Sequence, residues 1–385
     1  MKIRNCSIDE FAAYEKSCGK KIILFGTGVI ASIPAAYDIA RYHLESQILF
    51  AVDNDETKWG TEFAFAGRNI PVRSAEALKE VKDRDDVILL VTVSHFYEVI
   101  CQLHQMQLEQ AECFILPVMY VSRLHKENRG MKRIKEGILK RTEKAVIPKK
   151  IHYMWFGGKE LPDVLKNCIS SWKKFCPDYE IIRWDETNYD LNRHPYMRQA
   201  YERKQWGFIP DYGRLDILYE HGGIYLDTDA ELIKPLDEML HQEAFVSVEK
   251  WNVVNAGGGA GCIPHHRGIK KMLEGRRDIL FEVGGKLNKT TCGYYDTLPF
   301  LKEGFCLDGT NQQIAGVNLY ASEYFHPYDY MSGETVLTEN TCSIHHFNGG
   351  WLDEKTILRR ELTKGMYQKL SALSFKDEIK VSDLL

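Results

Sequence analysis

The sequence predicts an α/β protein built from two domains, and three observations lead to this prediction. The chain has 385 residues, which is long for a single hydrophobic core. Its first third alternates short apolar runs with helix-like segments, a pattern typical of a doubly wound parallel sheet. A second alternating set follows a stretch rich in lysine and arginine. We therefore expect a first domain over 1–120, a basic linker over 121–147 and a second domain over 148–385.

The composition is that of an ordinary globular protein, with 44% hydrophobic and 27% charged residues. The net charge of −4 points neither to nucleic acid nor to a membrane. Asp9 and Glu10 follow the first residues where a secretory signal would be apolar, and no apolar stretch reaches the roughly 18 residues that span a bilayer. The ten cysteines are scattered without a Cys-x-x-Cys pair, which favours free thiols over zinc ligation. We expect a cytoplasmic protein that does not bind nucleic acid.

In the first domain, a glycine turn follows the first apolar strand of the alternating set. The strand at 22–25 runs into Gly26 and Gly28, and the next strand, at 48–52, ends at Asp53. This spacing fits the dinucleotide-binding fingerprint, with an acid where the ribose would bind. Gly26, Gly28 and Asp53 are therefore candidate cofactor-binding residues. The alternative is that the glycines only permit a tight turn and that the domain is regulatory or structural.

The joint between the domains is strongly basic. Between Arg123 and Lys150, eleven Lys or Arg residues stand against three Glu residues. A solvated linker accounts for this composition. The alternative is peripheral docking on anionic lipid, since each basic residue near such a surface adds about 1 kcal/mol.

The second domain contains an apolar strand that ends in two acidic residues, Asp227 and Asp229. Side chains alternate along a strand, so residues two apart share a side if the backbone stays extended. Two carboxylates can then converge on Mg²⁺ or Mn²⁺, which prefer hard oxygen ligands. Asp227 and Asp229 are therefore candidate metal ligands. The alternative is a solvated turn, since many surface turns contain Asp-x-Asp.

Two further segments precede this pair. A strand from residue 151 ends in Trp155 and Gly157, where an indole could stack on a base and glycine lets a ligand approach the backbone. Asp211 and Arg214 then lie three residues apart on a helix that ends at Gly222. An intrahelical ion pair would explain this spacing equally well, and spacing alone does not place the helix start near the acidic pair.

Two segments follow the acidic pair. The glycine-rich segment at 255–261 suits a flexible platform for a sugar and an acceptor, or it is a simple turn. His265 and His266 come directly after a proline, which favours a loop that enters a helix over a metal site.

The order of these motifs makes a family resemblance specific. The second domain contains the strings Ile-His-Tyr-x-Trp-Phe-Gly-Gly, Asp-Tyr-x-Arg-Leu-Asp-Ile-Leu-Tyr and Gly-Gly-Ile-Tyr-Leu-Asp-Thr-Asp. Over roughly 148–352 it resembles glycosyltransferase family 32, which includes bacterial capsule and lipopolysaccharide sugar transferases and is related to the yeast initiating mannosyltransferase and the clostridial glucosylating toxins. The resemblance implies a GT-A fold that binds a nucleotide sugar with Mn²⁺ or Mg²⁺. The first domain resembles the Rossmann-like domain found beside sugar-modifying enzymes of bacterial polysaccharide pathways.

The resemblance also implies roles for single residues. Trp155 would stack on the nucleobase, and Asp211 and Arg214 would hold the donor sugar and its ribose or phosphate. Asp227 would hydrogen-bond the ribose or sugar, and Asp229 would ligate the metal.

The segment at 343–351 resembles the closing segment of the family. A histidine there, His345 or His346, would complete the metal shell or contact the diphosphate, and Trp351 would close over the donor. Of the two histidines we name His346 as the candidate metal ligand and leave His345 open. This chain departs from the family at Gly350, where serine is common, and at Pro210 and Gly213 beside the helix start.

The function implied by the resemblance is a retaining, metal-dependent transfer of a sugar, probed first with UDP-sugars. The acceptor would be a glycan or lipid-linked glycan of a bacterial surface polysaccharide, and the hydroxyl would attack beside the departing phosphate. Two rival hypotheses remain: a metal-dependent phosphohydrolase that uses the same carboxylates, and a sugar-nucleotide-binding protein without catalysis.

Overall fold

The computed structural model describes residues 1–108, 110–121, 139–349 and 354–385. The chain divides into two compact units, of which the first comprises Met1–Arg133 and Asp353–Leu385 and the second Ile134–Leu352. Sequence analysis assigned the C-terminal residues to the second domain, so the structure corrects that boundary. Both units combine helices with sheets that contain parallel strands, which confirms the α/β class.

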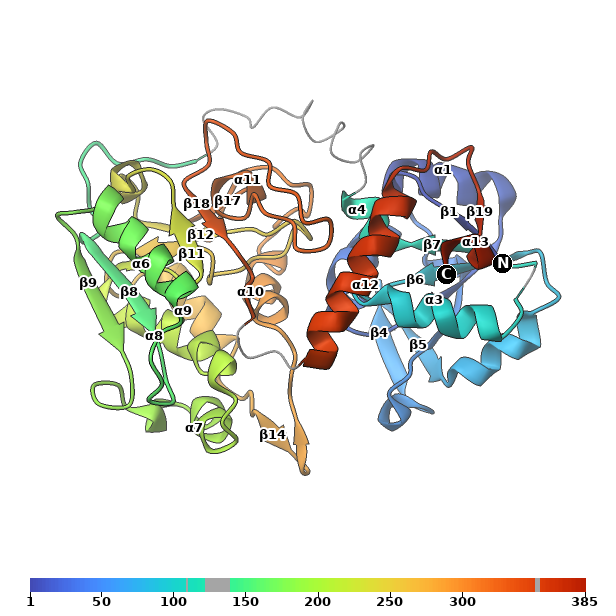
Figure 1. Ribbon diagram of the computed structural model, residues 1–385, viewed down its shortest axis with the longest axis horizontal. Helices are drawn as coiled ribbons and strands as arrows, with labels where there is room; N and C mark the ends of the chain where they lie inside the picture. The colour runs from blue at the N-terminus through green and yellow to red at the C-terminus, as the bar shows by residue number, and fades with distance from the viewer. Residues whose placement is uncertain (109, 122–138, 350–353) are drawn as a thin grey trace. The chain divides into compact units, whose positions relative to one another are not determined.

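An eight-stranded sheet forms the centre of the described part of the first unit (Figure 1). Its strands, in spatial order, are β19 (Ile379–Lys380), β1 (Lys2–Arg4), β7 (Glu112–Ile115), β6 (Val87–Val91), β2 (Lys21–Phe25), β3 (Ile48–Val52), β5 (Arg68–Arg73) and β4 (Glu62–Phe65). In this spatial order, neighbouring strands from β1 through β7, β6, β2 and β3 to β5 are parallel. The two edge strands, β19 and β4, are antiparallel to their neighbours. β6 is buried along its whole length, as expected for a parallel strand covered on both faces. The chain order reverses between β2 and β6, where ligands gather in open sheets of this kind.

Helices and short helical turns connect these strands. They are α1 (Ile8–Cys18), η1 (Ala31–Ala35), α2 (Ala36–Arg41), η2 (Glu45–Gln47), η3 (Glu56–Lys58), η4 (Ala75–Val81), α3 (Phe96–Gln105), α4 (Leu116–Val121), α12 (Glu354–Ser371) and α13 (Val381–Leu384). α1 begins with a capping box in which Ser7 and Glu10 accept each other's backbone amide hydrogens, which fixes the helix start. The C-terminal α12 lies along α3 and α4 (Figure 1). It buries Met366, Tyr367 and Leu370, which explains why the C-terminal segment belongs to this unit.

A mixed seven-stranded sheet forms the centre of the described part of the second unit. Its strands, in spatial order, are β16 (Gln312–Ile314), β17 (Val317–Tyr320), β12 (Ala244–Ser247), β13 (Ala260–Cys262), β10 (Gly223–Tyr225), β8 (Lys150–Met154) and β9 (Glu180–Trp184). β10, β8 and β9 are parallel, whereas β13 runs antiparallel to both of its neighbours. Two small antiparallel sheets add β11 (Ala230–Leu232) with β18 (Ser343–His345), and β14 (Glu282–Val283) with β15 (Lys286–Leu287).

The helices of the second unit pack around this sheet. They are α6 (Asp163–Phe175), η5 (Leu191–Arg193), α7 (Pro195–Glu202), η6 (Trp206–Phe208), α8 (Pro210–His221), η7 (Asp237–Leu240), α9 (Arg267–Glu274), α10 (Cys292–Leu301) and α11 (Ser322–Phe325). α6 lies beside β11 (Figure 1), and its Trp172 donates to the Ala230 carbonyl at 2.6 Å. A core cluster that includes Trp172, Ile224 and Phe245 holds these layers together.

The predicted basic linker lies mostly outside the described residues. Its described part, 139–147, is held against the second unit by backbone hydrogen bonds, while most of its residues are exposed to solvent as expected of a solvated linker. The Thr142 amide donates to the His241 carbonyl at 2.7 Å, and the Val146 amide donates to the Leu240 carbonyl at 2.9 Å.

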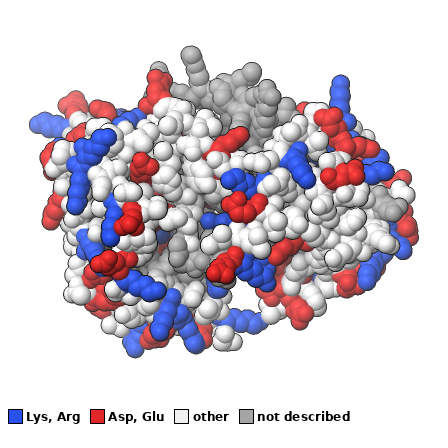
Figure 2. Space-filling model, in the orientation of Figure 1, with Lys and Arg blue, Asp and Glu red and all other residues white. Residues whose placement is uncertain are grey.

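On the face shown in Figure 2, basic and acidic side chains are interspersed. The ten cysteines all lie in described parts of the chain and are free thiols. Among the helices that the structure describes, none combines the length and the apolar character required to cross a bilayer.

Candidate active site at the Asp-x-Asp motif

The Asp-x-Asp motif lies at the carboxyl edge of the seven-stranded sheet. β10 pairs in parallel with β8, so Asp227 emerges beside the end of β8. The Asp227 amide donates to the Gly257 carbonyl at 2.8 Å, and its carbonyl accepts from the Ala230 amide at 2.9 Å. The backbone therefore turns between the two carboxylates instead of staying extended as expected. This turn is not fully solvated, since the side chain of Asp229 is only 14% exposed.

The small sheet of β11 and β18 adds a histidine to the acidic pair. The register places His345 opposite Ala230, immediately after the turn. His345 Nε2 lies 3.2 Å from Asp229 Oδ1 and 3.9 Å from Asp227 Oδ2. One ligand atom from each of these three residues lies within 4.8 Å of the others, which makes them a candidate metal site among the described residues.

His346, which sequence analysis assigned to the metal, points elsewhere. Neighbouring residues along a strand face opposite sides, so His345 and His346 cannot both reach the acidic pair. His346 Nε2 instead lies 2.9 Å from Glu231 Oε2, and its side chain is 36% exposed. The structure therefore brings His345, and not His346, to the two aspartates.

α8 brings Arg214 and Asp211 to the same place, as the family resemblance implied and spacing alone left open. Arg214 Nη2 lies 3.2 Å from Asp211 Oδ1 and 3.5 Å from Asp227 Oδ1. The guanidinium also lies 5.5 Å from the ring centroid of Tyr225. The Arg214 side chain is 4% exposed, and its Nη1 has no hydrogen-bond partner among the described residues.

The geometry of α8 and β10 explains why the start of the helix reaches the end of the strand. The chain reverses at Gly222, so β10 runs back along α8. From Arg214 to Gly222 the helix rises about 12 Å. From Gly222 to Asp227 the extended chain covers about 16 Å. These similar lengths place Arg214 and Asp227 side by side.

Charge interactions within the cluster shift the pKa values of Asp229 and His345. Burial alone would raise the pKa of Asp229, but His345 and the Asn348 amide, which donates at 2.8 Å, lower it to about 2. Burial alone would lower the pKa of His345, but Asp229 and then Asp227 raise it. Each of the two groups therefore favours the charged form of the other.

Burial also dominates the environment of Asp211. It raises the pKa of this carboxyl group to about 6, although Arg214 and Arg276 oppose the shift. Arg276 pairs with Asp296 at 2.6 Å, and both side chains are almost completely buried. A second layer of buried charge therefore lies behind Arg214.

The structure assigns packing contacts to two other predicted donor-binding residues. The Trp155 indole donates to the Lys159 carbonyl at 2.7 Å, and its ring packs partly against the core. A Cβ on Gly157 would lie 2.8 Å from the Trp206 ring, so this glycine lets Trp206 approach the backbone. Sequence analysis gave Trp206 no role. Their contact with a donor stays a prediction, and the predicted lid residue Trp351 lies outside the described residues.

The glycine-rich segment is a buried wall of the site and not a flexible platform. A Cβ on Gly257 would meet Asp227 Oδ2 at 2.1 Å and Arg214 Nη1 at 2.5 Å. A Cβ on Gly258 would meet the His326 ring at 2.2 Å. Gly257 therefore leaves room for Asp227 and Arg214, and Gly258 leaves room for the His326 ring. His266, in turn, caps α9 as expected, accepting the Gly268 amide hydrogen at 3.1 Å.

In the first unit, Asp53 binds the backbone of the predicted glycine turn at Thr27, between Gly26 and Gly28. Asp53 Oδ2 accepts from the Thr27 amide at 2.9 Å and from Lys58 Nζ at 2.8 Å. A Cβ on Gly26 would lie 2.3 Å from Val93 Cγ1, so packing alone requires this glycine. A Cβ on Gly28 would meet nothing within 4 Å. Nucleotide binding at this turn stays a prediction, and the observed contacts favour the structural alternative.

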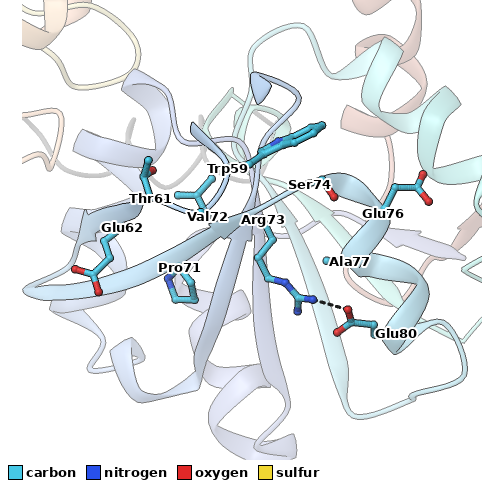
Figure 3. Close-up of a pocket in the computed structure, with 11 residues that line it drawn as sticks. Trp59, Thr61, Glu62, Pro71, Val72, Arg73, Ser74, Glu76, Ala77 and Glu80 are labelled. Atoms are coloured by element: carbon cyan, nitrogen blue, oxygen red, sulfur yellow. Dashed lines mark hydrogen bonds and ion pairs between the residues drawn. The ribbon is translucent and has the colours of Figure 1, made fainter. Parts of the chain in front are cut away.

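An open depression of about 690 Å³ also lies on the first unit. Figure 3 shows Arg73 reaching toward Glu80 on one side, with Thr61 and Glu62 on the other. The depression is separate from the Asp-x-Asp cluster, which belongs to the second unit.

Comparison with known proteins agrees with this location of the site. Residues 162–246 match the model of a family described as a glycosyltransferase sugar-binding region containing a DXD motif. The matched segment runs from α6 to β12 and contains Asp211, Arg214, Asp227 and Asp229.

Individual relatives are also named as glycosyltransferases. Inositol phosphoceramide mannosyltransferase 3 of Schizosaccharomyces pombe is 32% identical over 109 residues, which are 27% of this chain and 30% of that protein. An uncharacterized glycosyltransferase of Acanthamoeba polyphaga mimivirus is 26% identical over 220 residues, covering 53% of this chain and 82% of that protein. The solved PaToxG glycosyltransferase matches with a TM-score of 0.33 and 20% identity, over 41% of this chain and 69% of that chain.

The matched region lies within the second unit, which is therefore similar to glycosyltransferases over these residues. The relatives differ in how much of their length is matched. The chain spans about a third of the length of two inositol phosphoceramide mannosyltransferases of Schizosaccharomyces pombe, covering 30% of mannosyltransferase 3 and 36% of mannosyltransferase 2.

Proposed function

We propose that this chain transfers a sugar from a nucleotide-sugar donor to a glycan or lipid-linked glycan acceptor. The observation that carries the proposal is the convergence of Asp227, Asp229 and His345 beside the buried Arg214. This cluster lies at the carboxyl edge of a sheet, where ligands of α/β proteins commonly bind. The family match to a DXD-containing sugar-binding region supports the same activity.

The residues of the cluster fit a divalent cation. Asp227 and Asp229 offer carboxylate oxygens and His345 offers an imidazole nitrogen, all within 4.8 Å of one another. Carboxylates suit Mn²⁺ and Mg²⁺, and the added nitrogen favours Mn²⁺ over Mg²⁺. When bound, the cation supplies positive charge beside the diphosphate leaving group.

Arg214 would bind the donor from the other side. Its Nη1 is buried without a hydrogen-bond partner among the described residues, which is costly unless a ligand accepts from it. Asp211 and Asp227 hold the guanidinium in place. A phosphate or sugar oxygen of the donor would satisfy Nη1, and the fixed positive charge would stabilise the diphosphate as it departs.

Finer assignments belong to the same proposal. The chain would retain the anomeric configuration and act in the synthesis of a bacterial surface polysaccharide, as the resemblance implies. The reversal of strand order in the first sheet supports a Rossmann-like first unit, and the mixed sheet with Asp-x-Asp at its edge supports a GT-A second unit. Because several relatives are named mannosyltransferases, GDP-mannose belongs beside UDP-sugars in any donor test.

The test is incubation of the full chain with a panel of UDP- and GDP-sugars and Mn²⁺, with and without glycan acceptors. We expect release of nucleoside diphosphate with at least one donor, and at least about 100-fold less in Asp229→Asn, since a developing charge loses its stabilisation. Release of inorganic phosphate would instead support a phosphohydrolase. A shift in melting temperature without turnover would support a binding protein.

A further inference from the structure

His326 is a buried histidine behind the candidate metal site, and sequence analysis gave it no role. It follows α11 directly and is 3% exposed. Its ring lies against the Cα of Gly258, where a Cβ would approach to 2.2 Å. Any side chain at Gly258 would therefore displace the ring, so the buried wall is shaped around it.

A chain of hydrogen bonds links His326 to the cluster. Ser247 Oγ lies 2.6 Å from the Asn255 carbonyl oxygen and 3.0 Å from His326 Nε2. His326 Nδ1 lies 3.3 Å from His345 Nδ1, and His345 Nε2 faces Asp229 at 3.2 Å. Three side chains therefore connect a backbone carbonyl to the acidic pair in an unbroken series.

The direction of these bonds follows from counting hydrogens. A carbonyl only accepts, so the single hydroxyl hydrogen of Ser247 is donated to Asn255. Ser247 Oγ must then accept from His326 Nε2, which carries a hydrogen. A neutral imidazole has one N–H, so His326 Nδ1 is the acceptor for a hydrogen on His345 Nδ1.

This direction leaves His345 Nε2 as the nitrogen that can offer a lone pair toward Asp227 and Asp229. A histidine binds a metal through a bare nitrogen while the other ring nitrogen donates to a partner that fixes the ring. Phe347 stacks on the same ring, with centroids 4.2 Å apart and an angle of 28° between the planes. Stacking against Phe347 thus fixes the plane of the His345 ring. The hydrogen bond to His326 Nδ1 fixes the rotation of the ring and its tautomer.

We propose that His326 is a positioning residue that holds His345 in the tautomer and orientation in which Nε2 binds the divalent cation. The proposal rests on the cation site of the proposed function. Removing the acceptor at His326 Nδ1 frees the ring of His345 and lets its hydrogen move to Nε2, where it blocks the metal. Ser247 acts one step further back, by fixing the hydrogen of His326.

The experiment measures the affinity of the full chain for Mn²⁺ alone, by calorimetric titration. His326→Leu removes the acceptor, and His326→Asn retains one, because the Asn amide oxygen can take the place of Nδ1. We expect His326→Leu to weaken Mn²⁺ binding by about 10- to 100-fold, the usual effect of losing a partner of a ligating histidine. His326→Asn should stay within about threefold of the wild type.

His152→Leu is the matched control. His152 is equally buried, at 0% exposure, and is also hydrogen-bonded through both nitrogens, to Gly222 and Trp184. Among the described residues, no hydrogen bond or ion pair joins the His152 side chain to Asp227, Asp229 or His345. His152→Leu should therefore weaken Mn²⁺ binding far less than His326→Leu does, even if it lowers the melting temperature.

Equal Mn²⁺ affinity of His326→Leu and the wild type would overturn the proposal. So would equal losses in His326→Leu and His152→Leu, because the effect would then come from folding. A wild-type chain that does not bind Mn²⁺ would contradict the cation site itself, and the positioning role with it. If the wild type binds Mn²⁺ and turns over a donor, and all His326 variants bind Mn²⁺ with the same affinity, only the positioning role of His326 is rejected and the proposed function stands.

Discussion

Asp211 is a carboxylic acid in which burial opposes two arginines. Its pKa is raised to about 6, against an ordinary value of 3.8, because the cost of burying the charge exceeds the attraction of Arg214 and Arg276. The folded state therefore favours the protonated form. The contribution of protonated Asp211 to the free energy of unfolding is fully present below about pH 4. It is lost as the pH rises through about 6.

This shift gives a prediction for Asp211→Asn. Between pH 4 and pH 7 the wild type should lose about 3 kcal/mol of stability relative to the variant, since a shift of about two units corresponds to that free energy. Urea denaturation followed by tryptophan fluorescence measures this, because all tryptophans except Trp59 belong to the second unit. The exposed Asp163 supplies the control variant Asp163→Asn. Parallel pH profiles for wild type and Asp211→Asn would contradict the assignment.

The single residues that sequence analysis found are those whose chemistry shows in a local pattern. Asp227 and Asp229 follow a strand, and Arg214 lies on the adjoining helix. Spacing alone did not bring Arg214 to the aspartates, and only the family resemblance implied that they share a site. The sequence could not show whether His345 or His346 faces the aspartates, because this depends on the register of β18. His326 had no local signal, since its role depends on contacts with Ser247 and His345, 79 and 19 residues away.

At the scale of elements, the corner between α8 and β10 positions the site. Gly222 ends α8 as the sequence predicted, with φ 64° and ψ −163°. Only glycine adopts this conformation readily. A Cβ there would also lie 2.9 Å from the Cys262 carbonyl oxygen and from the Pro264 nitrogen, which are backbone atoms that cannot move aside cheaply.

Gly222→Ala should therefore destabilise the second unit by about 2–4 kcal/mol, combining backbone strain with overpacking. It should also weaken Mn²⁺ binding, because α8 and β10 set the distance between Arg214 and Asp227. The control is Gly365→Ala in α12, which has open space around it and should be neutral or stabilising by up to about 1 kcal/mol. Thermal unfolding of both variants decides the matter, and equal melting temperatures would refute the account of the corner.

The longer elements could be predicted because their apolar runs have a clear period. The strands at 22–25, 48–52 and 151–155 all appear within a residue or two of their expected bounds. The three-residue strands β11 and β18 carry no such period, and their pairing across more than a hundred residues is what brings His345 to the turn.

At the scale of the whole chain, the C-terminal segment returns to the first unit. β19 pairs with β1, placing Ile379 opposite Ile3, and α12 packs on α3. A two-residue strand leaves almost no mark in a sequence, so the predicted domain boundary extended to the last residue. The chain length predicted two domains and the periodicity of the first third predicted an α/β first unit, whereas the α/β fold of the second unit was implied by the family resemblance.

The central claim is that Asp227, Asp229 and His345 together hold a divalent cation, and the nitrogen ligand is its sharpest consequence. The most direct measurement is pulsed electron paramagnetic resonance of Mn²⁺ bound to the full chain, which detects a directly coordinated histidine nitrogen. We predict one such nitrogen in the wild type and in His346→Gln, and none in His345→Gln. A nitrogen signal that persists in His345→Gln, or that disappears in His346→Gln, would contradict the site described above.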